Sequence, residues 1–249
     1  MAYRAGLFRD SILSKTEGGR GRIENEGWSL HMNEPQVRDL WGGPAGRIEL
    51  IIDRPAAAPR GAAIIAHPHP LLGGNAEHKV PAMLARTLRN DGWMTLRPNF
   101  RGVGATEGEH DEGNGEADDL VAVAARLRDM HADLPLVLIG FSFGGYVQIA
   151  VSQKLVDSGA PPMRLVLVGA GIGHVEGSRV YVPGNVPPDT LIIHGEKDER
   201  VPLCNVMRWA EPQGIPVVVV PGADHFFARR LPVLTRFVLA HLKGDACNR

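Results

Sequence analysis

Cysteine is nearly absent from this chain of 249 residues, which contains only Cys204 and Cys247. Two cysteines cannot build a disulfide framework, and these two are too far apart in the sequence to form the paired ligands of a structural metal site. We therefore expect a fold that is held together by a hydrophobic core. A chain of this length can bury such a core in one large domain.

Long apolar runs are also missing. No run reaches the length of a transmembrane helix, and no apolar stretch of signal-peptide length follows the first residues, Met1 to Arg4. We therefore expect a cytoplasmic protein without a membrane span.

The chain carries no excess of either charge, with 27 basic and 28 acidic residues and a formal net charge of -1. Because no long basic run occurs, we do not expect nucleic acid or an anionic membrane surface as the main partner. We expect a monomer or a homodimer.

Alternation of strand and helix patterns describes most of the chain. Residues 1–27 are polar and glycine-rich, and we interpret them as an N-terminal extension of a single domain over residues 28–249. Strands are predicted over residues 28–32, 37–41, 46–53, 62–66, 93–97, 136–139, 165–168, 190–194 and 217–220. Helices are predicted over residues 79–90, 115–130, 146–156, 201–211 and 226–242. This alternation predicts an α/β fold with a mostly parallel, doubly wound sheet, to which the N-terminal strands add an antiparallel edge.

One strand-to-turn transition carries a chemical signature. The apolar run Leu136–Ile139 leads directly into Gly140-Phe141-Ser142-Phe143-Gly144, and a helical segment follows. A serine in this context lies on a sharp, strained turn, called a nucleophile elbow, where neighbours two residues away must lack bulk. The pattern predicts Ser142 as a nucleophile.

A serine hydroxyl needs a base that takes its proton and a carboxylate that orients the base. Functional groups in an α/β sheet lie at the carboxyl ends of the strands. Asp198 follows the predicted strand 190–194, and His225 follows the strand 217–220. We therefore predict Asp198 as the acid and His225 as the base. Asp224, Glu196 and Glu199 are lesser candidates for the acid.

Acyl transfer also requires N–H donors for the developing oxyanion. One predicted donor is the backbone of Phe143, directly after the nucleophile. The second should come from the loop His67–Gly74, whose two prolines have no N–H, so the donor is either His69 or Leu71.

Two further clusters suggest metal binding less strongly. His67, His69 and His78 have no carboxylate or thiolate at ligand spacing, and hydrogen bonding within the loop is the better interpretation. The acidic stretch from Glu107 to Asp119 lacks calcium-loop spacing and is interpreted as a solvated loop with carboxylates near the N-terminus of the following helix. No P-loop lysine or dinucleotide fingerprint occurs, so we predict no metal and no organic cofactor.

Together these residues resemble the α/β-hydrolase superfamily, and in particular small bacterial members without a cap domain that are related to the dienelactone hydrolases. The matching segments are His67-Pro68-His69-Pro70-x-x-Gly73-Gly74, Asn99-Phe100-Arg101-Gly102-Val103-Gly104, Gly108, Gly115-Glu116-x-Asp118-Asp119, Gly140-Phe141-Ser142-Phe143-Gly144-Gly145, His194-Gly195-x-x-Asp198 and Gly222-Ala223-Asp224-His225-Phe226-Phe227. They span residues 46–242. The resemblance implies the order nucleophile, acid and base for Ser142, Asp198 and His225, and leaves the substrate open.

A helical lid is not expected, because only residues 171–189 separate two successive strands where caps are commonly inserted in this fold. We predict an open, shallow site. Its predicted walls are Leu71, Leu72, Phe100, Val103, Phe143, Ile172, Phe226 and Phe227.

The sequence thus favours a serine esterase that acts on a small-molecule ester, with a small or short acyl group, through an acyl-enzyme on Ser142. A thioesterase, a peptidase or an acyltransferase would use the same triad. A non-catalytic binding protein that keeps the fold is the alternative from another class. An epoxide- or halide-type hydrolase is disfavoured, because it usually needs a carboxylate at the elbow.

Overall fold

The computed structural model describes residues 35–244. The predicted N-terminal extension, residues 1–27, and the predicted strand over residues 28–32 lie outside the described residues. Cys247 lies outside them as well, and Cys204 is an exposed free thiol.

One eight-stranded sheet forms the centre of the described part of the chain. Its strands are β1 (Gln36–Gly43), β2 (Gly46–Asp53), β3 (Ala62–Ala66), β4 (Met94–Pro98), β5 (Leu136–Phe141), β6 (Arg164–Val168), β9 (Leu191–Gly195) and β10 (Val217–Val220). The strand order is β1-β2-β4-β3-β5-β6-β9-β10. β1 pairs antiparallel with β2, and β2 antiparallel with β4, whereas the other neighbours are parallel. The predicted mostly parallel sheet with an antiparallel N-terminal edge is confirmed.

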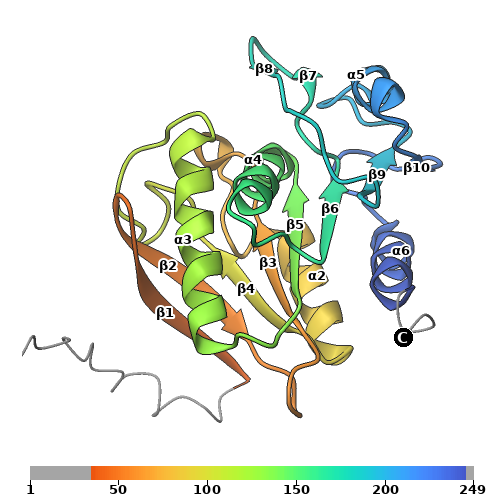
Figure 1. The fold of residues 1–249 in the computed structure, drawn as a ribbon. Helices are drawn as coiled ribbons and strands as arrows, with labels where there is room; N and C mark the ends of the chain where they lie inside the picture. Colours follow the sequence, from red (N-terminus) through yellow and green to blue (C-terminus); the bar gives the residue numbers. More distant parts are fainter. Residues whose placement is uncertain (1–34, 245–249) are drawn as a thin grey trace, which may run out of the picture. The chain divides into compact units, whose positions relative to one another are not determined.

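Helices cover both faces of this sheet. They are α2 (Lys79–Asn90), α3 (Asn114–Met130), α4 (Phe143–Asp157), α5 (Leu203–Ala210) and α6 (Leu231–Lys243). Helices α2 and α6 pack on one face, and α3 and α4 lie together on the other (Figure 1). This double cover explains why β3 and β5 are buried at every position, as expected for central parallel strands. None of the helices within residues 35–244 has both the length and the apolar character that a membrane crossing requires.

The segment between β6 and β9 contains no helical lid. It forms a two-stranded hairpin from β7 (Gly173–His174) and β8 (Val180–Tyr181), which pair antiparallel. The prediction that residues 171–189 are too short for a lid is confirmed. The hairpin itself was not predicted, because strands of two residues have no measurable periodicity.

The last helix begins later than predicted. The pattern predicted a helix from Phe226, whereas α6 begins at Leu231. Phe227 and Arg229 have φ values of 53° and 60°, which are incompatible with a right-handed helix. Residues 226–230 instead form turns, in which Arg230 N–H donates to the Phe227 carbonyl at 2.8 Å.

The acidic stretch 107–119 is exposed at Glu107, Glu109, Asp111 and Glu112, as expected of a solvated loop, and Glu116 lies in the first turn of α3. Two of its carboxylates are buried, which the sequence did not predict. Glu116 is fully buried and accepts hydrogen bonds from the backbone N–H groups of Asp111 and Gly113. Asp119 is buried and bonded to Arg101 at 2.8 Å. These two carboxylates fix the loop that precedes α3.

Helix α4 approaches the sheet so closely that two positions of its first turn, Gly144 and Gly145, have no room for a side chain. A Cβ atom at Gly144 would lie 2.5 Å from the Ala66 carbonyl oxygen and 2.6 Å from the His67 carbonyl oxygen. A Cβ atom at Gly145 would lie 2.6 Å from the Ala170 side chain. The first turn of α4 is therefore wedged between the ends of β3 and β6.

Replacing Gly144 by Ala should destabilise the protein, because the new methyl group meets fixed backbone rather than a flexible side chain. Overpacking of this kind costs about 1–3 kcal/mol. Gly42→Ala is the matched control, since a Cβ atom there meets nothing within 4 Å. Urea unfolding should show a lower free energy of unfolding for Gly144→Ala only. Equal stabilities for the two variants would contradict the close approach.

Candidate active site

Ser142 lies between β5 and α4 in a strained backbone conformation, with φ 58° and ψ -122°. Its N–H donates to the Val168 carbonyl at 3.0 Å, and its carbonyl accepts from Gly171 N–H at 2.9 Å. These bonds to the end of β6 offset the strain, which is usually found at functional sites. The turn has the geometry that the Gly-x-Ser-x-Gly pattern predicted.

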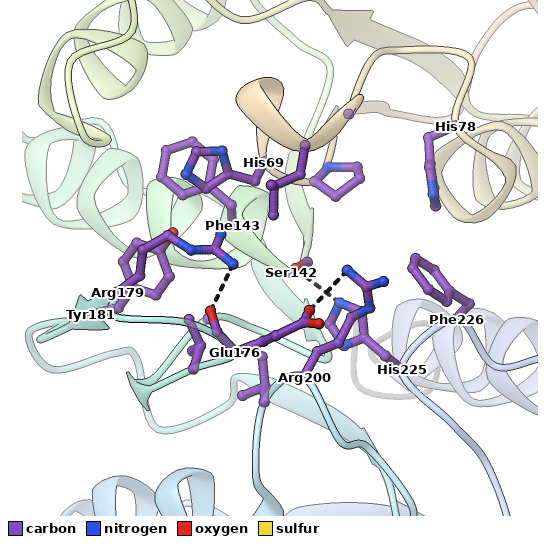
Figure 2. Close-up of a pocket in the computed structure, with 16 residues that line it drawn as sticks. His69, His78, Ser142, Phe143, Glu176, Arg179, Tyr181, Arg200, His225 and Phe226 are labelled. Carbon is purple, nitrogen blue, oxygen red and sulfur yellow. Dashed lines mark hydrogen bonds and ion pairs between the residues drawn. The ribbon is translucent and has the colours of Figure 1, made fainter.

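The structure brings Ser142, His225 and Asp198 into one hydrogen-bonded series. His225 Nε2 lies 3.0 Å from Ser142 Oγ, and His225 Nδ1 lies 2.8 Å from Asp198 Oδ2 (Figure 2 draws the first of these contacts). Asp198 and His225 are buried and follow β9 and β10, as the chain order predicted. An imidazole between a hydroxyl and a carboxylate can take the hydroxyl proton while the carboxylate stabilises the resulting cation.

The Asp198 carboxylate is fixed by its own loop. Its Oδ1 atom accepts from the N–H groups of Arg200 at 3.0 Å and Val201 at 2.8 Å, which leaves Oδ2 for His225. The competing acids bond elsewhere. Glu196 accepts from Gly222 N–H, and Asp224 accepts from Ala228 N–H.

A second buried histidine touches the same carboxylate. His194 Nε2 lies 2.9 Å from the Val201 carbonyl and 3.4 Å from Asp198 Oδ2. Burial lowers the pKa of His194, although the Asp198 carboxylate opposes this shift. In the sequence, His194 is part of the segment His194-Gly195-x-x-Asp198, which by itself predicts no role for it. Its position at the end of β9, four residues before the acid, was the available signal.

His67 connects the β3 loop to the loop after β4. Its Nδ1 lies 2.6 Å from the Pro68 carbonyl, and its Nε2 accepts from Phe100 N–H at 2.9 Å. A carbonyl only accepts and a backbone N–H only donates, so the proton must be on Nδ1 of a neutral ring. Burial lowers the His67 pKa to about 3, with smaller effects from His78 and His69.

The structure distinguishes the two candidate donors in this loop. Leu71 N–H donates to the His69 ring at 3.2 Å, whereas His69 N–H has no acceptor among the described residues. The Phe143 N–H is the first of α4 and has no acceptor within the helix. His69 and Phe143 therefore have the N–H groups that are free to bind an oxyanion.

A cavity of about 130 Å³ lies at Ser142 and His225. Among its predicted walls, Leu72, Phe143 and Phe226 line it, and Leu71 lines the neighbouring cavity. The prediction was wrong for Phe100, Ile172 and Phe227, which are at most 2% exposed and belong to the core. Val103 lines neither cavity. The loops after the strands turn these apolar side chains inward, where they close the end of the core.

The remaining wall comes from the hairpin, which sequence reasoning missed. Glu176, Arg179 and Tyr181 from the hairpin line the cavity together with Arg200 (Figure 2). Glu176 Oε2 forms an ion pair with Arg200 Nη1 at 3.1 Å, and this pair links the hairpin to the loop that carries Asp198. No group of three possible metal ligands is present within residues 35–244.

Comparisons with known proteins agree with this geometry. The family described as "alpha/beta hydrolase fold" matches residues 71–158. XC6422 of Xanthomonas campestris, described as an α/β serine hydrolase without lid, is 33% identical with a TM-score of 0.74, over 84% of this chain and 94% of that one. An α/β serine hydrolase homologue from Coxiella burnetii is 35% identical with a TM-score of 0.71, over 83% and 97% of the two chains.

A sequence relative, the uncharacterized protein RP471 of Rickettsia prowazekii, is 30% identical over 206 residues, which cover 78% of this chain and 82% of the relative. The chain belongs to the α/β-hydrolase family and is a homologue of its serine hydrolases without a lid. Est1E from Butyrivibrio proteoclasticus and an esterase from Pyrobaculum calidifontis share the fold at 17% and 16% identity, with TM-scores of 0.64 and 0.66.

The His67 ring should remain neutral and protonated on Nδ1 from pH 8 to about pH 4. Its folded pKa lies below the unfolded value, so its stabilising contribution is complete above about pH 6.5 and decreases as the pH falls toward 3, by up to about 1.4 kcal/mol per pH unit. Long-range ¹H–¹⁵N NMR spectra of the histidine rings test this directly. Titration of His67 near pH 6.5 would contradict the buried hydrogen bonds.

Proposed function

We propose that this protein is a carboxylic ester hydrolase that works through an acyl-enzyme on Ser142. The observation that carries the proposal is the contact of His225 with both partners, 3.0 Å from Ser142 Oγ and 2.8 Å from Asp198 Oδ2. The strained backbone at Ser142 supports it, since the fold maintains a conformation that a structural serine would not require.

In the proposed reaction, Ser142 Oγ attacks the ester carbonyl carbon while His225 Nε2 takes the hydroxyl proton. The carbonyl oxygen becomes an oxyanion, to which the N–H groups of Phe143 and His69 donate. Such donors are worth about 10²–10³ in rate each. His225 then gives the proton to the departing alkoxide, and an alcohol leaves. Water attacks the acyl-enzyme through the same base, which releases the acid and restores Ser142.

The cavity at Ser142 favours a small group beside the scissile bond. Its volume of about 130 Å³ is much less than the pockets that hold drug-sized ligands, about 300–1,000 Å³. We therefore expect the group on this side of the ester carbonyl to be small. Where this group is the acyl group, it corresponds to the short-acyl substrates predicted from the sequence.

Labelling by a fluorophosphonate should give one adduct on Ser142, and the protein should hydrolyse p-nitrophenyl acetate faster than the octanoate. Ser142→Ala should give no adduct, and its kcat should be about 10⁶-fold lower than that of the wild type, because the nucleophile is removed. Intact mass and absorbance measure the two effects, and circular dichroism checks that the variant is folded. Absence of both label and turnover in the folded wild type would refute the proposal.

Replacing Asp198 by Asn should lower kcat about 10⁴-fold, because the amide cannot hold His225 in the required tautomer or stabilise its cation. Asp224→Asn is the matched control. Asp224 is the sequence neighbour of His225, but within residues 35–244 its carboxylate bonds only to Ala228 N–H, at 2.8 Å. Steady-state kinetics on p-nitrophenyl acetate compare the two. Equal losses would mean that Asp198 is not the orienting acid.

A further inference from the structure

A second, larger cavity continues from the one at Ser142. It has a volume of about 620 Å³, against about 130 Å³ at the nucleophile. The two cavities share His69, Leu72, Phe143, Arg179 and Tyr181 in their linings. The space beside Ser142 therefore extends past Phe143. The substituents on the two sides of a bound ester carbonyl would lie in cavities of very different volume.

Aromatic rings make up much of the larger cavity, which we call the aromatic groove and define by Phe143, Tyr146, Tyr181, His69 and His110. The Tyr146 and Tyr181 rings lie 4.9 Å apart, and the Phe143 ring lies 5.8 Å from Tyr181 and 4.8 Å from His69. The chain has only 14 Phe, Tyr and Trp residues and three tyrosines, two of which meet here. Clustered rings bind flat, aromatic groups through offset and edge-to-face contacts.

The groove also contains polar groups whose hydrogen bonds are incomplete. The Tyr181 hydroxyl is buried and has no hydrogen-bond partner of acceptable geometry, although Arg179 lies close enough to lower its pKa against the raising effect of burial. Arg179 donates to the Glu176 carbonyl at 2.9 Å and forms no ion pair with a carboxylate within residues 35–244 (Figure 2). Buried polar groups are normally satisfied, and Arg179 is the group that lies beside this hydroxyl. The polar group that the groove offers to a ligand is therefore the Arg179 guanidinium.

The charges around the groove favour a neutral polar group over an anion. Arg179 carries a positive charge, but Glu112 also lines the groove and carries a negative one. His69 is neutral at pH 7, because burial and then the Arg179 charge lower its pKa to about 4. A phenolic hydroxyl both donates and accepts, so it suits a site with an acidic side and a basic side.

We propose that the aromatic groove binds the larger half of the substrate, and that this half is an aryl group with a neutral hydroxyl that meets Arg179. The smaller half lies at Ser142 and His225. This inference rests on the esterase function proposed above, to which it adds a substrate class. In this assignment Tyr146 and Tyr181 are specificity-determining residues and take no part in proton transfer.

Esters matched in size test the aromatic requirement. For an aryl acyl group, methyl 3-(4-hydroxyphenyl)propanoate and methyl 3-phenylpropanoate are compared with methyl 3-cyclohexylpropanoate. For an aryl alcohol group, the acetates of 2-(4-hydroxyphenyl)ethanol and 2-phenylethanol are compared with that of 2-cyclohexylethanol. In one of the two series we expect kcat/KM to be about three- to tenfold higher for phenyl than for cyclohexyl, the range that an aromatic contact supplies. The ring hydroxyl should raise it further.

Two variants test the assignment to residues. Tyr146→Leu should reduce the phenyl-to-cyclohexyl ratio toward one, whereas Trp209→Leu, an aromatic residue outside both cavities, should leave the ratio unchanged. Arg179→Gln should remove the advantage of the ring hydroxyl, about tenfold for a bond to a charged donor. Arg208→Gln, exposed on α5, is its control. Ratios are compared because they do not depend on the fraction of folded enzyme.

The outcomes separate this inference from the proposed function. Hydrolysis of p-nitrophenyl acetate with no phenyl preference in either series would overturn the aryl subsite and leave the esterase intact. A para-carboxylate that is favoured over the para-hydroxyl would overturn the neutral-group assignment. No labelling of Ser142 and no hydrolysis of any ester would overturn both proposals.

Discussion

The strained backbone at Ser142 is the constraint on which the rest of the site depends. A φ of 58° at a residue with a side chain is stable only if its surroundings hold it there. Ser142 forms two backbone hydrogen bonds, one with Val168 at the end of β6 and one with Gly171 just after it. Together with the close fit of Gly144 against the end of β3, these bonds provide the support. Three neighbouring strands therefore determine the direction of a single hydroxyl group.

The parallel strand order then brings distant residues to this hydroxyl. His225 is 83 residues from Ser142 in the chain and 27 residues from Asp198, yet all three lie within hydrogen-bond distance in series. Strands β9 and β10 run in the same direction as β5, so their following loops meet at one edge of the sheet. Buried backbone bonds hold the Asp198 carboxylate, and so the series does not depend on exposed ion pairs.

A hairpin occupies the place where other members of this fold insert a cap. Strands β7 and β8 are only two residues each. Tyr181 of β8 and Arg179 from the segment that joins the two strands line both cavities. The ion pair between Glu176 and Arg200 connects the hairpin to the acid loop, although both side chains are half exposed and the pair adds little stability. The hairpin therefore shapes the space around the nucleophile without enclosing it.

The sequence by itself determined the order of strands and helices, the elbow at Ser142, and Asp198 and His225 as its candidate partners, because each depends on local periodicity, on glycines and on position after a strand. Only the tertiary structure decided which apolar residues face the site. Phe100, Ile172 and Phe227 have the composition of pocket walls but close the core instead. The bond between the His67 ring and Phe100 N–H was equally out of reach, since it joins two segments that are 33 residues apart. The hairpin was missed because its strands of two residues are too short to leave a pattern.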